Sequence, residues 1–489
     1  MTGSGVPPEP SHPRTIMKHP AAIALTALLV ACSGPGADEP SAAGPDVWRS
    51  LEGGWLLDVE AGERIRNPGV LISPDGRIAR VGPGVADSPD PASSPEVIEL
   101  TDTQTLLPGL IDLHAHYNMD LTGDGRAEET RYNPLGFLAN GVTTTFPAGE
   151  YEPQVMMALQ ERLASGEQVG ARLLRSGPYF GSTRPDWDPG ITAEEIHAEV
   201  DALWAEGVRH FKAKGAGPEH IRALVERVHH HGGTVTGHVD SGARGSANSV
   251  DAIEAGVDRI EHILGGYVLD RTQPAYPVWN QVDTTSADFR RTVQLFLDNQ
   301  VFFNATITAP IYLTEKVEGF DFWVDEPAFF TPFVQEIVAA REAPSSRLMS
   351  ELYEAMKRTT LAFYNAGGGP YITLGTDNPS AGEYLAGFSA HRELHALVLA
   401  GLPPVAALRA GTINGARALG MEDRIGSIAP GKWADLFVID GDPLVDIRNT
   451  RNVALVLLEG VPHDPETLLD GVWGRIGPAH EGERADWWR

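Results

Sequence analysis

The stretch GLIDLHAHYNMD, residues 109–120, places two histidines one residue apart at the end of an apolar run. In a β-strand alternate side chains point to the same face, so His114 and His116 would face one point while Ala115 faces the other way. Imidazole nitrogens that converge in this way are typical ligands of a metal ion. Taken alone, the pair is equally compatible with two polar residues at a strand end, so the rest of the chain has to decide.

The order of the elements that follow this stretch indicates the fold. Further apolar runs are separated by segments of helical character such as TAEEIHAEVDALWAEG and PEHIRALVERVHHHGG. The runs are GVTTTFPA, ARLLRSGPYF, VRHFKAKG, GTVTGHV, DRIEHI, QVFFNATI and PYITLGTD. With the first stretch they make eight strands that alternate with helices, which is the signature of a parallel α/β sheet. The length suits a (β/α)₈ TIM-type barrel, although periodicity alone leaves a doubly wound sheet open.

Short β-rich segments flank this region at both ends. Between Val47 and Arg80 apolar and polar residues alternate around turn signals such as PDG. A similar pattern returns in RIGSIAPGKWADLFVIDGDP and NVALVLLEG, within residues 424–460. We therefore predict a small β-sandwich built from both chain ends. The predicted boundaries are 47–105 and 421–462 for the two parts of the sandwich, 106–420 for the barrel and 463–489 for a C-terminal tail.

The N-terminal residues have the features of an export signal. MKHPAAIALTALLVAC begins at Met17, and its apolar stretch has signal-peptide length and is too short to span a bilayer. The sequence LVAC, ending at Cys32, resembles the lipobox of bacterial lipoproteins, in which the cysteine carries the lipid. We predict a signal peptide and lipobox over 1–32, a flexible tether over 33–46, and a lipid on Cys32. The protein is then an exported lipoprotein of the bacterial cell envelope, on the periplasmic side of a membrane or at the cell surface.

Composition narrows the classes of partner and of site. The formal net charge is −28, which disfavours nucleic acid as a partner because nucleic-acid binding needs a basic face. Cys32 is the only cysteine in the sequence, so the folded body has neither a disulfide framework nor a thiolate for metal binding or nucleophilic catalysis. We expect a small-molecule substrate, and the sequence leaves the oligomeric state open.

Polar side chains collect where the predicted strands end. In a barrel these ends converge on the face that carries the chemistry of barrel enzymes. A lysine inside an apolar strand is costly unless it is neutralised, paired or chemically changed. The strand-end residues are His114, His116, Lys212, His238, His262 and Asp377. Lys214 lies on the same strand face as Lys212, and so it is the alternative to Lys212 at this position.

This order of residues, His-x-His, Lys, His, His, Asp, together with RIGSIAPGKWADLFVID, resembles the amidohydrolase superfamily of metal-dependent hydrolases over roughly residues 48–462. The runs GVRHFKAKGAG, TVTGHVDSG and GVDRIEHI are most similar to its imidazolonepropionase-like and prolidase-like branch. Members of that branch with a lysine on the fourth strand use it as a carbamate. The resemblance implies two divalent metal ions, expected to be Zn²⁺, with one ion held by His114, His116 and Asp377, the other by His238 and His262, and carboxylated Lys212 as the bridge.

The resemblance also implies an activity. A metal-activated hydroxide would cleave an amide-type C–N bond, and Asp377 would pass the proton of the attacking water to the leaving nitrogen. The expected substrate is a dipeptide or an N-acyl amino acid. Two other functions stay open: hydrolysis of a cyclic amide or amidine, as in imidazolonepropionase and the related deaminases, and a non-catalytic binding lipoprotein of the envelope. The first of these usually works with one metal and no lysine carbamate.

Two residues are candidates for substrate binding. Arg244, in HVDSGARGS after the fifth strand, would hold a substrate carboxylate or pair with one of the chain's own carboxylates. Tyr179 ends the third strand, where it would polarise a carbonyl group or line the pocket. The aromatic segment GFDFWVDEPAFFTPF, residues 319–333, is either an apolar patch packed under its own loop or a wall of the substrate pocket.

Overall fold

The structure is a computed structural model that describes residues 47–84, 94–311, 326–340, 346–379, 384–484 and 487. The predicted signal peptide, lipobox and tether over 1–46 lie outside these residues. Within the described part of the chain, no helix combines the length and the apolar character needed to cross a membrane. Export of the protein therefore stays a prediction.

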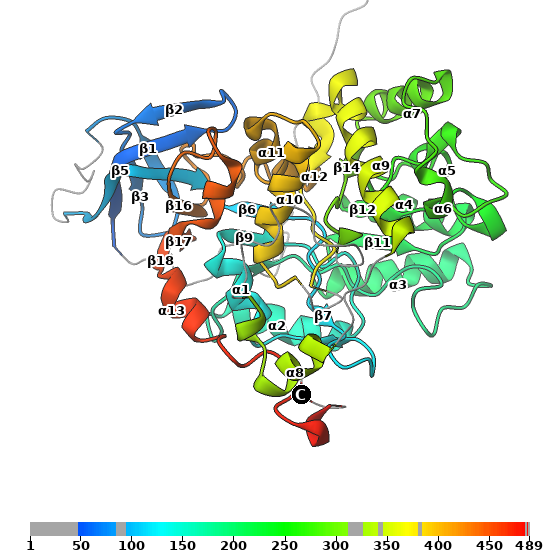
Figure 1. Ribbon diagram of the computed structural model, residues 1–489, viewed down its shortest axis with the longest axis horizontal. Helices are drawn as coiled ribbons and strands as arrows, with labels where there is room; N and C mark the ends of the chain where they lie inside the picture. The colour runs from blue at the N-terminus through cyan, green and yellow to red at the C-terminus, as the bar shows by residue number, and fades with distance from the viewer. Residues whose placement is uncertain are drawn as a thin grey trace, which may run out of the picture. The chain divides into compact units, whose positions relative to one another are not determined.

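Eight parallel strands from the middle of the sequence form a ring, and several of them are labelled near the centre of Figure 1. Three strands pair in the order β10-β9-β6, and five pair in the order β11-β12-β13-β14-β15. Parallel bridges join the two groups on both sides, from Phe180 to Ala213 and from Ala115 to Asn378, and so close the ring. The structure confirms the (β/α)₈ barrel. The strands are β6 (Leu110–Asp112), β9 (Val142–Thr145), β10 (Arg172–Leu173), β11 (His210–Lys214), β12 (Thr234–His238), β13 (Arg259–Glu261), β14 (Phe302–Asn304) and β15 (Ile372–Thr373).

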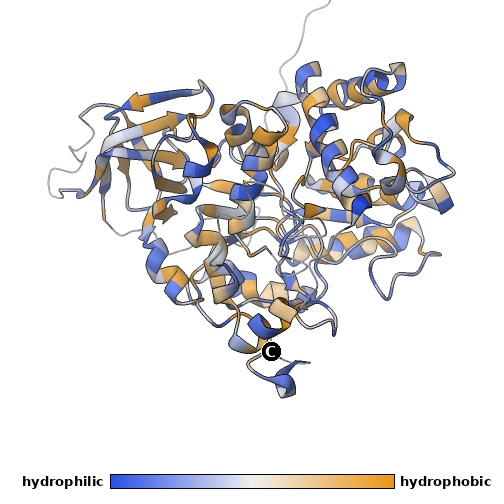
Figure 2. Ribbon diagram, viewed as in Figure 1, coloured by the Kyte–Doolittle hydropathy of each residue, from blue (hydrophilic) through white to orange (hydrophobic). Residues whose placement is uncertain are grey.

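A helix follows each barrel strand, and the helices carry both hydrophobic and hydrophilic residues (Figure 2). In the third of these helices Thr192 and Glu195 form a capping box, and the buried residues Ile196, Val200 and Leu203 share one face. The helices are α1 (Asn133–Ala139), α2 (Pro153–Ala164), α3 (Ala193–Ala205), α4 (Pro218–His231), α5 (Ser249–Glu254), α7 (Ala287–Asp298), α9 (Arg347–Phe363) and α10 (Phe388–Leu399). Further short elements are β7 (Asn118–Met119), β8 (Ala127–Glu128), α6 (Tyr276–Trp279), α8 (Pro332–Ala340), α11 (Pro404–Ala410) and α12 (Ile413–Ala418).

The two ends of the described chain build one β-domain, seen at the left of Figure 1. Its strands pair in the order β18-β17-β16-β5-β1-β3-β4, with β2 on β1. The antiparallel pairing of β16 with β5 joins the two chain ends, and apolar side chains from both, such as Leu106 and Leu436, share one core. The structure confirms the β-sandwich. Its strands are β1 (Arg49–Asp58), β2 (Glu63–Arg66), β3 (Val70–Ile72), β4 (Ile78–Val81), β5 (Glu96–Pro108), β16 (Leu436–Asp440), β17 (Val453–Leu458) and β18 (Val461–His463).

The chain passes from the sandwich into the barrel without a linker. β5 ends at Pro108, Gly109 donates its backbone N–H to the Asp435 carbonyl at 2.7 Å, and β6 begins at Leu110. A side chain at position 109 would clash, because a Cβ atom there would lie 2.1 Å from Thr143 Oγ1. Glycine is therefore required where the two domains meet.

A buried network around Arg172 also joins the barrel to the β-domain. Arg172 on β10 donates to Asp435 Oδ2 at 2.5 Å and to Glu459 Oε1 at 2.8 Å, and its guanidinium lies 4.0 Å from the Trp433 ring centroid. Its side chain is 6% exposed, so both ion pairs are shielded from water. The cation of one domain is therefore paired with two carboxylates of the other.

The segment after β18 packs back onto the barrel. Helix α13 (Pro465–Asp470) contacts α1, and Val472 and Ile476 are buried in one cluster with Phe329 and Phe330. Phe329 and Phe330 of the aromatic segment 319–333 belong to this cluster, so this part of the segment is an apolar patch, but it packs against the segment after β18 and not under its own loop. Residues 319–325 lie outside the described part of the chain.

Arg172→Met tests how strongly the two domains depend on this network. Without the guanidinium, Asp435 and Glu459 lose the buried cation that they share, so we expect the free energy of unfolding to fall by about 3–5 kcal/mol. Denaturant titration at neutral pH measures the change. The matched control is Arg66→Met, since Arg66 pairs with Asp102 at the surface and should contribute less than about 1 kcal/mol. Equal, small losses in both variants would contradict the role given to Arg172.

Candidate metal centre

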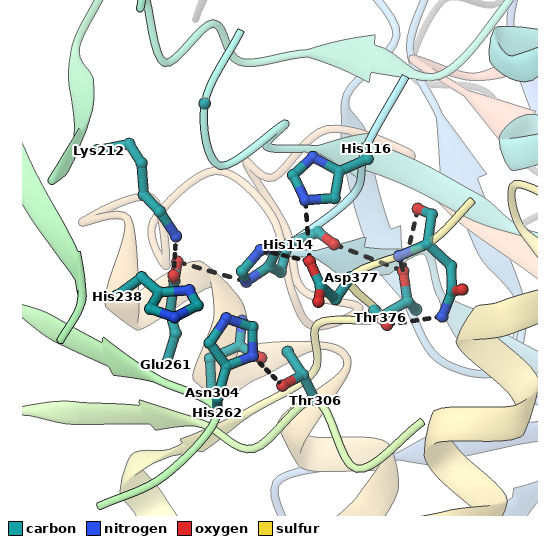
Figure 3. Close-up of polar contacts among 12 residues, drawn as sticks. His114, His116, Lys212, His238, Glu261, His262, Asn304, Thr306, Thr376 and Asp377 are labelled. Carbon is teal, nitrogen blue, oxygen red and sulfur yellow. Dashed lines mark hydrogen bonds and ion pairs between the residues drawn. The ribbon is translucent and has the colours of Figure 1, made fainter. Parts of the chain in front are cut away.

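The carboxyl ends of the barrel strands bring the six predicted ligands together, as Figure 3 shows. Lys212 is fully buried, and His114 and His116 are each 1% exposed. The six residues are His114, His116, Lys212, His238, His262 and Asp377. These six side chains thus converge as the barrel topology predicts.

Asp377 meets the two histidines of the opening motif. Its Oδ1 lies 3.0 Å from His114 Nε2 and 2.9 Å from His116 Nε2, so three ligand atoms gather around one point. Asp377 has φ +57°, a left-handed conformation that an aspartate adopts only under constraint, and its backbone N–H donates to the His114 carbonyl at 2.8 Å. The side chain is 25% exposed and therefore open to a substrate.

The backbone of His262 is also left-handed, and this conformation directs its side chain into the site. This residue directly follows β13 with φ +67°, so Glu261 and His262 both face the site although neighbouring strand residues normally alternate. The Thr306 hydroxyl donates to the Ala305 carbonyl at 2.9 Å and therefore accepts from His262 Nδ1, 2.7 Å away. Nε2 is left with its lone pair. It is buried and has no hydrogen-bond partner among the described residues.

His238 completes this side of the site. Its ring centroid lies 4.3 Å from that of His262, and its Nε2 lies 3.1 Å from the Tyr276 hydroxyl. His238 Nδ1 is buried and has no hydrogen-bond partner in the described part of the chain. Unsatisfied buried nitrogens are rare in proteins, and neutral imidazoles with available lone pairs fit a metal ion. Tyr276 lies on the short helix α6, away from any strand end, so no sequence pattern predicts its contact with His238.

Glu261 is the functional candidate that the sequence analysis missed. Its Oε2 contacts Lys212 Nζ, and its Oε1 accepts from Thr236 Oγ1 at 2.9 Å and lies 3.4 Å from His114 Nδ1. A signal existed, because Glu261 is a charged residue inside an apolar strand, which is the same argument that singled out Lys212. Lys212 therefore has a carboxylate partner in the structure.

Two groups of side chains have the spacing of metal ligands among the described residues. One consists of His114, His262 and Asp377, and the other of His238, Glu261 and His262. Within each group the ligand atoms lie within 4.8 Å of one another. Since His262 belongs to both, the two positions are adjacent. The donor set of imidazoles and carboxylates suits zinc and related divalent ions.

Burial sets the protonation states of these groups. It lowers the pKa of His114 and His238 well below the usual 6.5 and that of His262 to about 3, so the imidazoles are neutral at pH 7, as metal binding requires. Burial raises the pKa of Asp377, but His114 and His116 outweigh it and hold that pKa well below 3.8. Burial, then the charge of Lys214, lowers the pKa of Lys212 far below 10.5, which favours its neutral amine.

Asp112 ties the first and last barrel strands together beneath the site. It is fully buried and accepts from the backbone N–H of His114 at 3.0 Å and from the hydroxyl of Thr376 at 2.9 Å. Burial raises its pKa to about 6 despite these bonds. Asp112 thus holds the backbone at His114 and at Thr376, the residue before Asp377. Asp112 is not among the site residues predicted from the sequence.

The predicted substrate-binding residues lie in different walls. Arg244 is exposed in the short helix η1 (Ala243–Gly245), and it lines a cavity of about 550 Å³ together with Lys214, His238 and Tyr276. Tyr179 is 1% exposed and lines a neighbouring cavity of about 450 Å³. Its hydroxyl has no hydrogen-bond partner in the described ranges. Arg244 therefore lies beside the predicted ligands, whereas Tyr179 lies behind the side chain of Lys214, 5.5 Å from its Nζ.

Comparison with known proteins gives consistent matches. The sequence profile of the amidohydrolase family matches residues 105–462. Imidazolonepropionase of Micrococcus luteus is 26% identical over 416 residues, which cover 80% of this chain and 92% of that protein. A putative prolidase from Bifidobacterium longum superimposes with a TM-score of 0.64 at 24% identity, over 87% of this chain and 99% of that one. A Xaa-Pro dipeptidase with bound methionine in its active site gives 0.63 at 22% identity, over 85% and 100%. Both structures share the fold.

Thr306→Val tests the orientation of His262. The variant removes the acceptor for His262 Nδ1 at nearly constant volume, so the ring loses its fixed tautomer and we expect metal affinity to fall by about 10–100-fold. Competition with a chelator measures the dissociation constant. Thr373→Val is the matched control, because the buried Thr373 hydroxyl has no hydrogen-bond partner among the described residues. Unchanged metal affinity in Thr306→Val would contradict this role for Thr306.

Proposed function

The chain belongs to the amidohydrolase family, and on that premise we propose that it uses two zinc ions to hydrolyse the amide bond of a dipeptide or an N-acyl amino acid. The family match and the relatives already make it a metal-dependent hydrolase of C–N bonds. The observation that carries the proposal is the pair of adjacent ligand groups that share His262 and include the open carboxylate of Asp377.

Each side chain of the site then has a task. His114, His116 and Asp377 hold one ion, and His238, His262 and the newly identified Glu261 hold the other. The metal pair, when bound, makes hydroxide available near neutral pH and polarises the scissile carbonyl. Thr306 and Asp112 orient the residues that touch the ions. The Tyr276 hydroxyl oxygen would accept the N–H of His238 Nε2, which leaves the lone pair of His238 on Nδ1, available to a metal.

Asp377 is the residue that moves the proton. Its low pKa keeps it ionised, so it can accept a proton from the attacking water. The histidines engage its Oδ1, which leaves Oδ2 to take that proton and return it to the leaving nitrogen. Since the side chain is 25% exposed, it is open to a bound substrate. One carboxylate thus serves both halves of the reaction.

The charge of Lys212 decides how many ions the site holds. An ammonium beside two divalent cations would be repelled strongly at low dielectric. The ammonium would first lose one proton, and attack of the neutral amine on carbon dioxide, with release of a second proton, would then give a carbamate anion. Four positive charges are then balanced by Asp377, Glu261, the carbamate and a hydroxide. We assign this bridge to Lys212 rather than Lys214, because Lys212 contacts Glu261 while Lys214 lies at the rim, level with His238.

The contact of Lys212 with Glu261 favours a second candidate function. If Lys212 stays an ammonium paired with Glu261, the site is also neutral with a single divalent ion, balanced by Asp377 and one hydroxide. A one-metal centre fits the hydrolysis of a cyclic amide or amidine, and a relative over most of the chain is named an imidazolonepropionase. A non-catalytic binding lipoprotein is not favoured, because all six predicted ligands are present and converge.

Asp377→Asn tests the proton path. The amide oxygen can still contact a metal but cannot carry the proton, so we expect turnover to fall by about 10²–10⁴-fold while much of the metal stays bound. Turnover is measured on a panel of dipeptides, N-acyl amino acids and cyclic amides, and metal content by elemental analysis. Near-normal turnover by Asp377→Asn would rule out this path. Wild-type activity confined to cyclic amides would replace the proposal by the second candidate.

Export and lipid attachment form a separate proposal, which rests on residues outside the described part of the chain. The mature protein should partition into detergent, because Cys32 carries a lipid, whereas Cys32→Ser should stay in the aqueous phase or remain unprocessed. Ser33→Ala is the control and should partition like the wild type. Phase separation and the mass of the N-terminal peptide measure both outcomes. An unmodified Cys32 in mature protein from the native host would defeat the proposal.

A further inference from the structure

Among the described residues, no carboxylate lies within ion-pair distance of Lys214, although the charge of Asp377 acts on it from farther away. Lys214 is the last residue of β11, and the strand alternation turns it to the same side as Lys212, one layer nearer the rim and level with His238. Its Nζ lies 5.5 Å from the centroid of Tyr179. The lysine is only partly exposed. A lysine in that position is unfavourable unless an anion comes to it.

The cavity beside Lys214 has a basic lining. It measures about 550 Å³ and is bounded by the end of β11, the start of α4 and the loop after β12. Lys214, His220 and Arg244 contribute its basic side chains. Among the described residues that line it, Asp240 is the one carboxylate, and its Oδ1 accepts the backbone N–H groups of Ser241 and Ala275 at 2.7 and 2.6 Å. Asp240 is thus bound to the backbone.

The backbone around the cavity also favours the binding of an anion. Helix α4 begins after Gly217 with no side-chain cap, and Gly217 lines the cavity, so the positive end of the helix dipole lies at its wall. Arg244 has φ +54° between Gly242 and Gly245, which are also left-handed. This constrained turn presents the arginine at the cavity. His220 Nδ1 is buried with no hydrogen-bond partner in the described ranges.

The amount of positive charge exceeds the need of one substrate carboxylate. The whole chain carries −28, so a basic cavity next to the catalytic residues runs against its composition and attracts an anion. The α-carboxylate of a dipeptide or an N-acyl amino acid needs one partner, which Arg244 can supply in bidentate form. Lys214 and His220 are then left for a second negative group.

We propose that this cavity binds the side-chain carboxylate of an acidic amino acid, with Lys214 as the specificity-determining residue. The preferred substrates are then N-acyl or aminoacyl derivatives of glutamate or aspartate. This inference rests on the proposed amide hydrolysis, since it names the substrate class of the same site. Both carboxylates of the leaving amino acid find a cation, and the amide carbonyl remains at the metal ligands.

Two isosteric substrates test the inference by kinetics. With the same acyl group, the glutamate derivative should be hydrolysed with kcat/KM about 10–100-fold above that of the glutamine derivative. Lys214→Met and Lys214→Gln should remove most of that difference, mainly through the KM of the glutamate compound. Lys357→Met on α9 is the control and should keep the difference, because Lys357 pairs with Glu354 and is not among the residues that line the cavity. Equal hydrolysis of both compounds by the wild type would overturn the inference.

A binding measurement separates this inference from the proposed function. Calorimetry with metal-loaded enzyme compares glutarate, which has two carboxylates, with butyrate, which has one. We expect glutarate to bind at least about tenfold more tightly and to lose that advantage in both Lys214 variants. If no amide is hydrolysed but this pattern holds, the proposed function fails and the anion subsite stands. If glutarate binds equally to the wild type and to folded Lys214 variants, the subsite is wrong.

Discussion

The buried contact between Lys212 and Glu261 is the constraint on which the rest of the site depends. Both side chains are fully buried inside a protein barrel, where water cannot solvate a charge. Every further charge in the site must therefore be balanced locally. The surrounding histidines are neutral, Asp377 is ionised, and the number of metal ions that can enter depends on whether Lys212 is a cation or an anion. Chemistry at one nitrogen thus sets the composition of the whole centre.

The fold supplies this environment through its strand ends. Parallel strands aim their carboxyl ends at one face, and left-handed residues such as His262 and Asp377 turn side chains into the site that regular alternation would direct elsewhere. Asp112 and Thr306 hold the backbone and the rings from below. The β-domain contributes no residue to the metal ligands, yet its Asp435 and Glu459 neutralise Arg172 of the barrel. The candidate metal centre and the contact between the two domains therefore depend on separate networks of charged side chains.

Most of this could be predicted from the sequence because barrel periodicity and strand-end position are local properties. His114, His116, Lys212, His238 and Asp377 each follow from them. Glu261 was overlooked because the strand-end position was assigned to its neighbour His262. Adjacent residues of a strand face opposite sides, so both can face the site only if one of them has a left-handed backbone. The contact of Tyr276 with His238 depends on tertiary packing, which no sequence period records. Lys212 and Lys214 lie two residues apart on β11, so their side chains face the same side of the strand. Only their different depths in the barrel distinguish the two lysines.

The state of Lys212 is measured most directly by the ¹³C spectrum of zinc-loaded enzyme prepared in ¹³C-bicarbonate. The account predicts one protein-bound carbamate resonance per chain, together with two zinc ions. The resonance should be absent from Lys212→Ala and retained in Lys214→Met. A wild-type spectrum without the carbamate, in active enzyme that holds a single zinc ion, would contradict the binuclear account. Lys212 would then be the permanent cationic partner of Glu261.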